Sequence, residues 1–181
     1  MNHKQLSKLA LALGAMVMAG GAMAQSTATG TANVGATILK PISIAKDVDL
    51  NFGKVVPGAA LGTVVLSPLA ARTPSGGTTI MATQTGTVAA AQFTVTGEGA
   101  ATYTLSLPES TTMALTGTPG TTMTVDEFTS DLETVEGIAT LTGTAGGSGT
   151  KVIKVGATLN VGANQPQGVY SGTFEVTVAY N

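Results

Sequence analysis

Several residue types are absent from this chain or scarce in it. Its 181 residues include no cysteine, no tryptophan and one histidine, with only 4% aromatic and 10% charged residues. Without cysteine, disulfides, thiol catalysis and iron–sulfur clusters are excluded. With so few charged residues, the chain has no basic stripe that could neutralise phosphates. We therefore expect no nucleic-acid partner.

Small residues are abundant instead. The chain has 24 glycines and 31 threonines, and 43% of its residues are hydrophobic. With a net charge of only −2, it lacks the low hydrophobicity and high charge that produce disorder. The core must therefore be built from Ala, Val, Leu and Ile, with threonine on the exposed positions of strands.

The first 24 residues have the pattern of a secretory signal peptide. Lys4 and Lys8 precede an apolar run over residues 9–21, and Ala22-Met23-Ala24 follows as a small-x-small site. The run is shorter than the roughly 20 residues that span a bilayer. We expect cleavage between Ala24 and Gln25, and export to the periplasm, the cell surface or the extracellular space.

Cleavage would remove the only histidine, His3. The mature chain, residues 25–181, would then contain neither histidine nor cysteine, so Ser-His-Asp triads and Cys-His pairs cannot be assembled. We therefore expect a single domain that is not an enzyme, binds no cofactor and has no membrane span. An uncleaved anchor helix is the alternative for the N-terminus.

Hydrophobic residues of the mature chain alternate with polar ones, which is typical of strands. The clearest segment is residues 169–180, which we expect to form one C-terminal strand with one face on a core. That face would carry Tyr170, Gly172, Phe174, Val176, Val178 and Tyr180.

Further strands are expected along the chain. Residues 92–96 and 102–107 alternate across Gly97-Glu98-Gly99 and predict a hairpin. Residues 151–161 predict a strand with a bulge at Gly156. Shorter candidate strands are residues 64–66, 79–81 and 123–125, and turn signals lie at 57–58, 74–77, 119–120 and 146–149. This spacing favours an all-β fold, an antiparallel β-sandwich, although low-complexity disorder is the alternative for residues 110–122.

Two motifs carry a family resemblance. Leu50-Asn51-Phe52-Gly53 follows the first candidate strand, and Gly168-Val169-Tyr170-Ser171-Gly172-Thr173-Phe174 opens the last one. With Ala91-Gln92-Phe93-Thr94-Val95-Thr96-Gly97, they make the chain resemble a family of exported bacterial domains of unknown function. It is similar, more distantly, to archaic chaperone–usher pilins and spore-coat-U-like domains.

The pilin resemblance implies an immunoglobulin-like sandwich that lacks its final strand. The groove beside the C-terminal strand would then accept the N-terminal extension of a neighbouring subunit by strand addition. The acceptor edge would carry Tyr170, Phe174, Val176, Val178 and Tyr180. The partners implied are other copies or pilus subunits, and a periplasmic chaperone and usher.

Residues 25–36 could supply such a donor strand. Ala28, Gly30, Ala32 and Val34 alternate there with polar residues. The alternative is that residues 27–44 form the first strand of a complete sandwich. It is favoured because Ala and Gly bury little apolar area, so a donor strand built from them would bind weakly.

Five acids lie between Asp126 and Glu136, the densest charge in the chain. A solvated loop or strand edge is the plain interpretation, with calcium binding as an alternative. The acids could also form the carboxylate pair of a glycosidase, but no aromatic platform for a sugar ring accompanies them. The three tyrosines, Tyr103, Tyr170 and Tyr180, are expected to pack in the core with satisfied hydroxyls; ligand stacking is the alternative.

The sequence thus predicts a non-enzymatic exported structural protein, a pilin-like or cell-surface assembly subunit of a fimbrium acting by β-strand addition. A self-complete secreted or periplasmic binding module for glycan or protein is the alternative.

Overall fold

The computed structural model describes residues 27–81, 83, 86–132 and 138–181. The chain divides into two compact units, Met1–Thr37 and Ile38–Asn181. The predicted signal peptide and its cleavage site, Ala24 and Gln25, lie outside the described residues. In the first unit, residues 27–37 are exposed and form no strand.

The described part of the second unit is all-β and contains no helix. Its strands are β1 (Ser43–Val48), β2 (Val55–Val56), β3 (Gly62–Leu66), β4 (Arg72–Gly76), β5 (Thr79–Ile80), β6 (Ala91–Glu98), β7 (Thr102–Ser106), β8 (Ser110–Leu115), β9 (Thr122–Ser130), β10 (Ile138–Thr140), β11 (Ser148–Val161), β12 (Tyr170–Ser171) and β13 (Thr177–Tyr180). They form an eight-stranded, a three-stranded and a two-stranded sheet, and every pairing is antiparallel.

The 14-residue strand β11 organises the largest sheet. Its first half pairs with β6, its second half pairs with β3, and β9 pairs along its other edge. The pairing of β11 with β9 is irregular beside Gly156, as predicted, but the extra residue lies in β9, because the three steps from Thr129 to Asp126 face the two from Gly156 to Thr158. The predicted change of phase within β11 is therefore wrong, and its alternate residues from Ile153 to Val161 are all buried. A Cβ atom at Gly156 would collide with the carbonyl oxygen of Leu66, so glycine permits this close approach.

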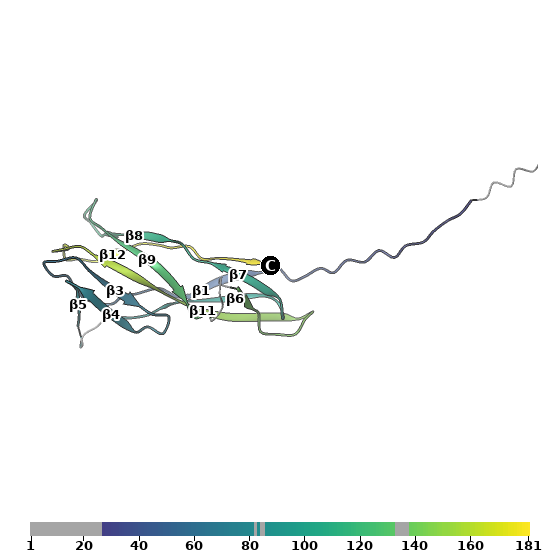
Figure 1. Ribbon diagram of the computed structural model, residues 1–181, viewed down its shortest axis with the longest axis horizontal. Coiled ribbons are helices and arrows are strands. Elements are labelled where there is room, and N and C mark those ends of the chain that lie inside the picture. Colours follow the sequence, from purple (N-terminus) through teal and green to yellow (C-terminus); the bar gives the residue numbers. More distant parts are fainter. Residues whose placement is uncertain (1–26, 82, 84–85, 133–137) are drawn as a thin grey trace, which may run out of the picture. The chain divides into compact units, whose positions relative to one another are not determined.

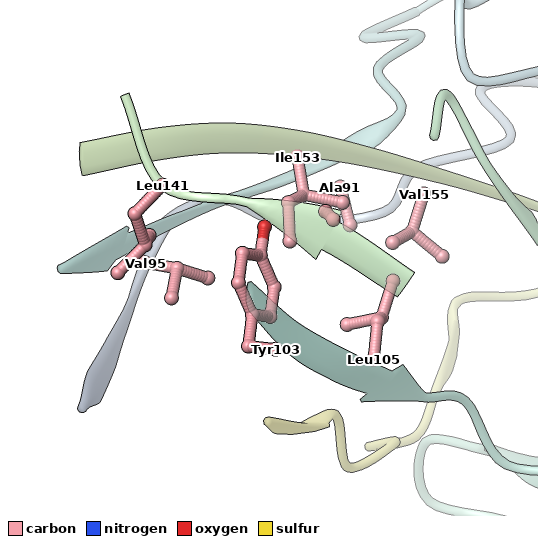
Figure 2. Packing of buried hydrophobic residues seen from close by; sticks show 8 residues of the cluster. Ala91, Val95, Tyr103, Leu105, Leu141, Ile153 and Val155 are labelled. Carbon is pink, nitrogen blue, oxygen red and sulfur yellow. The ribbon is translucent and has the colours of Figure 1, made fainter. Parts of the chain in front are cut away.

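Two hydrophobic clusters fill the interior. The first joins the eight-stranded and three-stranded sheets, and Figure 2 shows its side chains converging from β6, β7, β11 and the end of β10. Its members are Ala91, Val95, Tyr103, Leu105, Ala139, Leu141, Ile153 and Val155. The second contains Phe52, Val64, Leu66, Val125, Ala157, Leu159 and Val161. Strand β11 contributes to both, so the two clusters share one central strand.

The predicted hairpin of residues 92–96 and 102–107 is wrong. Strand β6 pairs with β1 and β11, whereas β7 pairs with β10 and β13. Val95 and Tyr103 are both fully buried in the first cluster, one from each sheet. The connection therefore carries the chain from the eight-stranded sheet to the three-stranded sheet. Each of the two strands pairs with partners in its own sheet.

The predicted C-terminal strand is interrupted. Strand β12 pairs with β8, β13 pairs with β7, and residues 172–176 between them form no strand (Figure 1). Tyr170 lies opposite Leu115 and Thr177 opposite Ser106, so the facing chain has two more residues over this span. That chain contains Pro108, which has no amide hydrogen for a ladder. The mismatch and the proline account for the break.

Other turn and loop predictions had mixed outcomes. Residues 74–77 were expected to turn, but Pro74 lies inside β4, whose only ladder partner among the described strands is β3. An edge strand tolerates proline because its outer side needs no amide donor. Residues 110–115 form β8, so disorder there is wrong. The turns at 119–120 and 146–149 are confirmed between β8 and β9 and at the start of β11.

Tyr103 is fully buried, and its hydroxyl has no hydrogen-bond partner among the described residues. The expectation of a satisfied hydroxyl is therefore wrong at this position, because the ring is surrounded by hydrocarbon side chains (Figure 2). Burial, and then the negative charge of Asp131, raises the pKa of Tyr103 to about 12. The phenol thus stays neutral in the folded protein at a pH where an unfolded chain ionises it.

Tyr103→Phe should raise the free energy of unfolding by about 1 kcal/mol at pH 7, because the variant no longer buries an unpaired hydroxyl. Above pH 10 the unfolded wild-type chain loses this proton while the folded chain keeps it, so wild-type stability should fall as pH rises from 10 to about 12. Urea unfolding at pH 7 and pH 11 checks both effects. If Tyr103→Phe were less stable than the wild type at both pH values, the hydroxyl of Tyr103 could not be buried without a hydrogen-bond partner.

Candidate functional site

A long groove with a volume of about 850 Å³ opens in the second unit. Residues 48–57 line one side of it and residues 165–174 the other. Its floor is apolar and includes Phe52, Phe93, Met113, Met123, Val125 and Leu159. We call this feature the groove.

The groove lies where the eight-stranded sheet begins and ends. In the strand order β1-β6-β11-β9-β8-β12, the outermost strands are β1 and β12. Val48 of β1 and Tyr170 of β12 line the same groove. The sheet therefore curls until its two ends approach each other, and the groove separates them.

Two of the strands that line the groove, β1 and β12, are edges of the eight-stranded sheet. Within the described chain, β1 has a ladder only with β6, β12 only with β8, and β13 only with β7. The outer backbone groups of these strands have no ladder partner. Such an edge can accept another strand through main-chain hydrogen bonds.

Phe174 holds the strandless stretch 172–176 against the body of the fold. Its ring lies 6.0 Å from that of Phe93 in an edge-on arrangement, and 4.9 Å from that of Phe128. The hydroxyl of Thr111 donates a hydrogen bond of 2.6 Å to the carbonyl oxygen of Thr173. The stretch is thus packed by side chains although its backbone joins no ladder.

The rim of the groove carries few charges. Lys46 and Asp49 form an ion pair of 2.6 Å, and both side chains are more than half exposed. Such a pair contributes little because solvent screens it. The floor residues named above are uncharged, so the groove suits an apolar, uncharged occupant.

Tyr180 joins the last strand to the beginning of the second unit. Its hydroxyl donates to the carbonyl oxygen of Lys40 at 2.8 Å and accepts from the amide of Glu98 at 2.6 Å. The Glu98 carboxylate accepts hydrogen bonds from the amides of Lys40, at 3.2 Å, and Gly146. We call this arrangement the Tyr180 latch. It holds Lys40 by both of its backbone groups.

Gly97 makes the latch sterically feasible. A Cβ atom there would collide with the Tyr180 hydroxyl. The glycine that suggested a hairpin turn therefore provides space for a tyrosine from the other end of the chain.

The predicted acceptor-edge residues have two kinds of surroundings, and Phe174 has both. Tyr170 and Phe174 line the groove. Phe174, Val176, Val178 and Tyr180 pack against the first hydrophobic cluster. Tyr170 also donates through its hydroxyl to the carbonyl of Pro166 and accepts from Gln165. The predicted satisfied hydroxyls are therefore found for Tyr170 and Tyr180.

The predicted donor residues Ala28, Gly30, Ala32 and Val34 are all exposed, and Val34 is 97% exposed. The alternative of a first strand over residues 27–44 is not observed, because residues 27–42 form no strand and β1 begins at Ser43. The donor role stays a prediction.

The acidic cluster does not form one site among its described members. Asp126 and Glu127 lie in β9, which is an interior strand between β11 and β8, so the strand-edge interpretation is wrong. Glu127 accepts a hydrogen bond from Thr158, and Asp131 accepts one from the amide of Lys154. Glu133 and Glu136 lie outside the described residues. The described residues contain no group of three or more His, Asp or Glu side chains that could hold a metal ion.

Sequence reasoning missed several residues of the groove. Met113 and Met123 lie on the inward faces of β8 and β9, and the alternation of residues 110–115 could have identified the first. Gln165 gave no such signal, because its role depends on Tyr170, and neither did Phe128, which lies outside the groove but packs on Phe174.

Tyr180→Phe should lower the free energy of unfolding by about 2 kcal/mol, because the Lys40 carbonyl and the Glu98 amide both lose their partner. Hydrogen exchange at the Glu98 amide should accelerate as well. Tyr170→Phe is the matched control, since it also removes two hydrogen bonds but leaves Glu98 untouched. If the Glu98 amide exchanged at the same rate in both variants, Tyr180 could not be its hydrogen-bond partner.

No described segment forms a helix of the length and apolarity needed to cross a membrane. Searches of curated proteins and of solved structures gave no significant match. A family model does match, over residues 42–180, from just before β1 to the end of β13. The chain therefore belongs to the family described as domain of unknown function DUF4402.

Proposed function

We propose that this protein is an exported structural subunit that assembles with copies of itself by β-strand addition. The observation that carries the proposal is the groove, which has an apolar floor and is lined in part by the edge strands β1 and β12. An extended segment laid in it would bond to those edges and bury alternate side chains on the floor. The fold would then be an immunoglobulin-like sandwich lacking one strand.

The occupant we propose is residues 25–36 of a second copy. The described part of this segment is exposed and forms no strand, so it is not committed to another pairing. Its side chains are uncharged, which matches the uncharged floor. Ala28, Gly30, Ala32 and Val34 would face the floor, because alternate side chains of a strand share one face.

A second copy is a better source of this strand than the same chain. To lie beside β1, the preceding residues must reverse direction within residues 37–42. That stretch has no Gly, Asn or Asp, the residues that supply the positive φ angles of two-residue hairpin turns. The Tyr180 latch also holds Lys40 by both backbone groups. Self-association is therefore expected.

The rest of the chemistry agrees with a structural role. The predicted signal peptide would place the protein in the periplasm, on the cell surface or outside the cell. The chain after residue 24 contains no histidine or cysteine for nucleophilic catalysis. Before assembly, a periplasmic chaperone and an usher would cover the same unpaired edges.

A binding module for a glycan is the second candidate, because of a second hollow of about 590 Å³, which shares Met123, Val161 and Gln165 with the groove. Hydroxyl and amide side chains from adjacent strands line it: Thr63, Ser75, Thr124, Asn160 and, from the following loop, Gln165. These groups suit a neutral polyol. A monomeric mature chain that binds oligosaccharides would favour this function over assembly.

Deletion of residues 25–36 should abolish self-association but leave a folded monomer, because the described part of that segment is exposed. A synthetic peptide of residues 25–36 should then bind the monomer. Light scattering of the mature and truncated chains, with fluorescence anisotropy of the labelled peptide, measures both effects. If the truncated chain unfolds and the peptide does not restore it, residues 25–36 are part of the fold and the proposal fails.

Charges placed on one face of the segment give a sharper test. Ala32→Asp with Val34→Asp should weaken self-association at least about tenfold, since the floor would bury two unpaired carboxylates. Thr31→Asp with Asn33→Asp is the matched control, because it adds the same number of carboxylates to the opposite face. Sedimentation velocity of the two variants compares them. If both double variants lost self-association equally, charge alone would control assembly, and the model of a strand with one buried face would be wrong.

A further inference from the structure

Every methionine of the chain after residue 24 lines the groove. These residues are Met81, Met113 and Met123. Because the chain has no cysteine, their thioethers are the only sulfur atoms that would remain after cleavage. The readily oxidised side chains of the mature protein are thus gathered at one surface.

Two of them form a cross-strand pair. Met113 of β8 lies directly opposite Met123 of β9. Both are partly buried and pack against the second hydrophobic cluster, so they belong to the floor. Met81 follows β5 and is 37% exposed. All three can be reached from the groove while it is empty.

We propose that the groove is an oxidant-sensitive binding site, which peroxide switches from apolar to polar at Met113 and Met123. In this step a sulfur lone pair attacks one oxygen of hydrogen peroxide and the O–O bond breaks. The thioether is oxidised by two electrons to a sulfoxide, and the peroxide is reduced to water. The side chain becomes polar and loses its fit to an apolar neighbour.

The surroundings make this change matter for binding. Val125 and Leu159 lie beside the pair on the floor and offer no hydrogen-bond donor from their side chains. A sulfoxide there is hydrated while the groove is empty and loses its water when an apolar occupant covers it. Oxidation should therefore weaken binding, and an occupant should protect the two thioethers from oxidation.

The order of oxidation follows from exposure. Met81 should react first, and Met113 and Met123 more slowly. Only the slower reaction should coincide with the loss of binding. The identity of the natural occupant rests on the proposed function, whereas the sensitivity of the floor does not.

The test uses the mature chain carrying Ala32→Asp and Val34→Asp, in which the groove should stay empty. The protein is treated with graded hydrogen peroxide, and peptide mass spectrometry follows sulfoxide formation at each methionine. Two probes report on the groove: the peptide of residues 25–36, and the anionic dye 8-anilinonaphthalene-1-sulfonate, whose aromatic rings bind apolar surfaces. Affinity for both should fall about tenfold as Met113 and Met123 are oxidised.

Met113→Leu with Met123→Leu is the control, because leucine keeps the volume and apolarity but cannot form a sulfoxide. This variant should bind both probes before and after peroxide. Circular dichroism of every sample checks that the fold is retained.

The inference is overturned if Met113 and Met123 resist peroxide, if their oxidation leaves dye binding unchanged, or if the leucine variant loses dye binding to the same extent. A peptide that never binds the untreated protein would count against the proposed function alone. The dye and the mass spectra would then still decide the oxidation inference.

Discussion

The backbone pairing of β11 is the interaction on which the rest of the structure depends. This strand is hydrogen-bonded to β6 and β3 along one edge and to β9 along the other, and it contributes side chains to both hydrophobic clusters. With no disulfide and few aromatic residues, the fold relies on this ladder and on aliphatic packing. One unbroken alternation of buried residues from Ile153 to Val161 lets this strand serve two clusters, and the extra residue of the bulge beside Gly156 lies in β9.

The curl of the sheet around β11 leaves β1 and β12 facing a common groove. An unpaired edge is ordinarily an aggregation hazard, which proteins avoid by covering or shortening it. Here two edges border one apolar floor, so the same covering strand would satisfy both.

Alternation in the sequence was enough to identify β11 and the strand character of residues 170–171 and 177–180, but not that the extra residue beside Gly156 belongs to β9. It could not reveal pairing partners, because the same alternation in residues 92–96 and 102–107 serves two different sheets. The groove was expected beside the C-terminal strand, but its floor depends on contacts between distant residues such as Phe93 and Phe174. The buried hydroxyl of Tyr103 could not be foreseen either, since nothing local indicates whether a partner lies within reach.

The Tyr180 latch also has a mechanical consequence. Tension applied to the chain before Lys40 would reach the folded unit first through the hydrogen bonds that Lys40 makes with Tyr180 and Glu98. Those bonds connect the pulled residue to the last strand and to β6, so the load is divided between two sheets instead of peeling β1 from its edge. A single tyrosine hydroxyl near the C-terminus would thereby help the folded unit to resist shear.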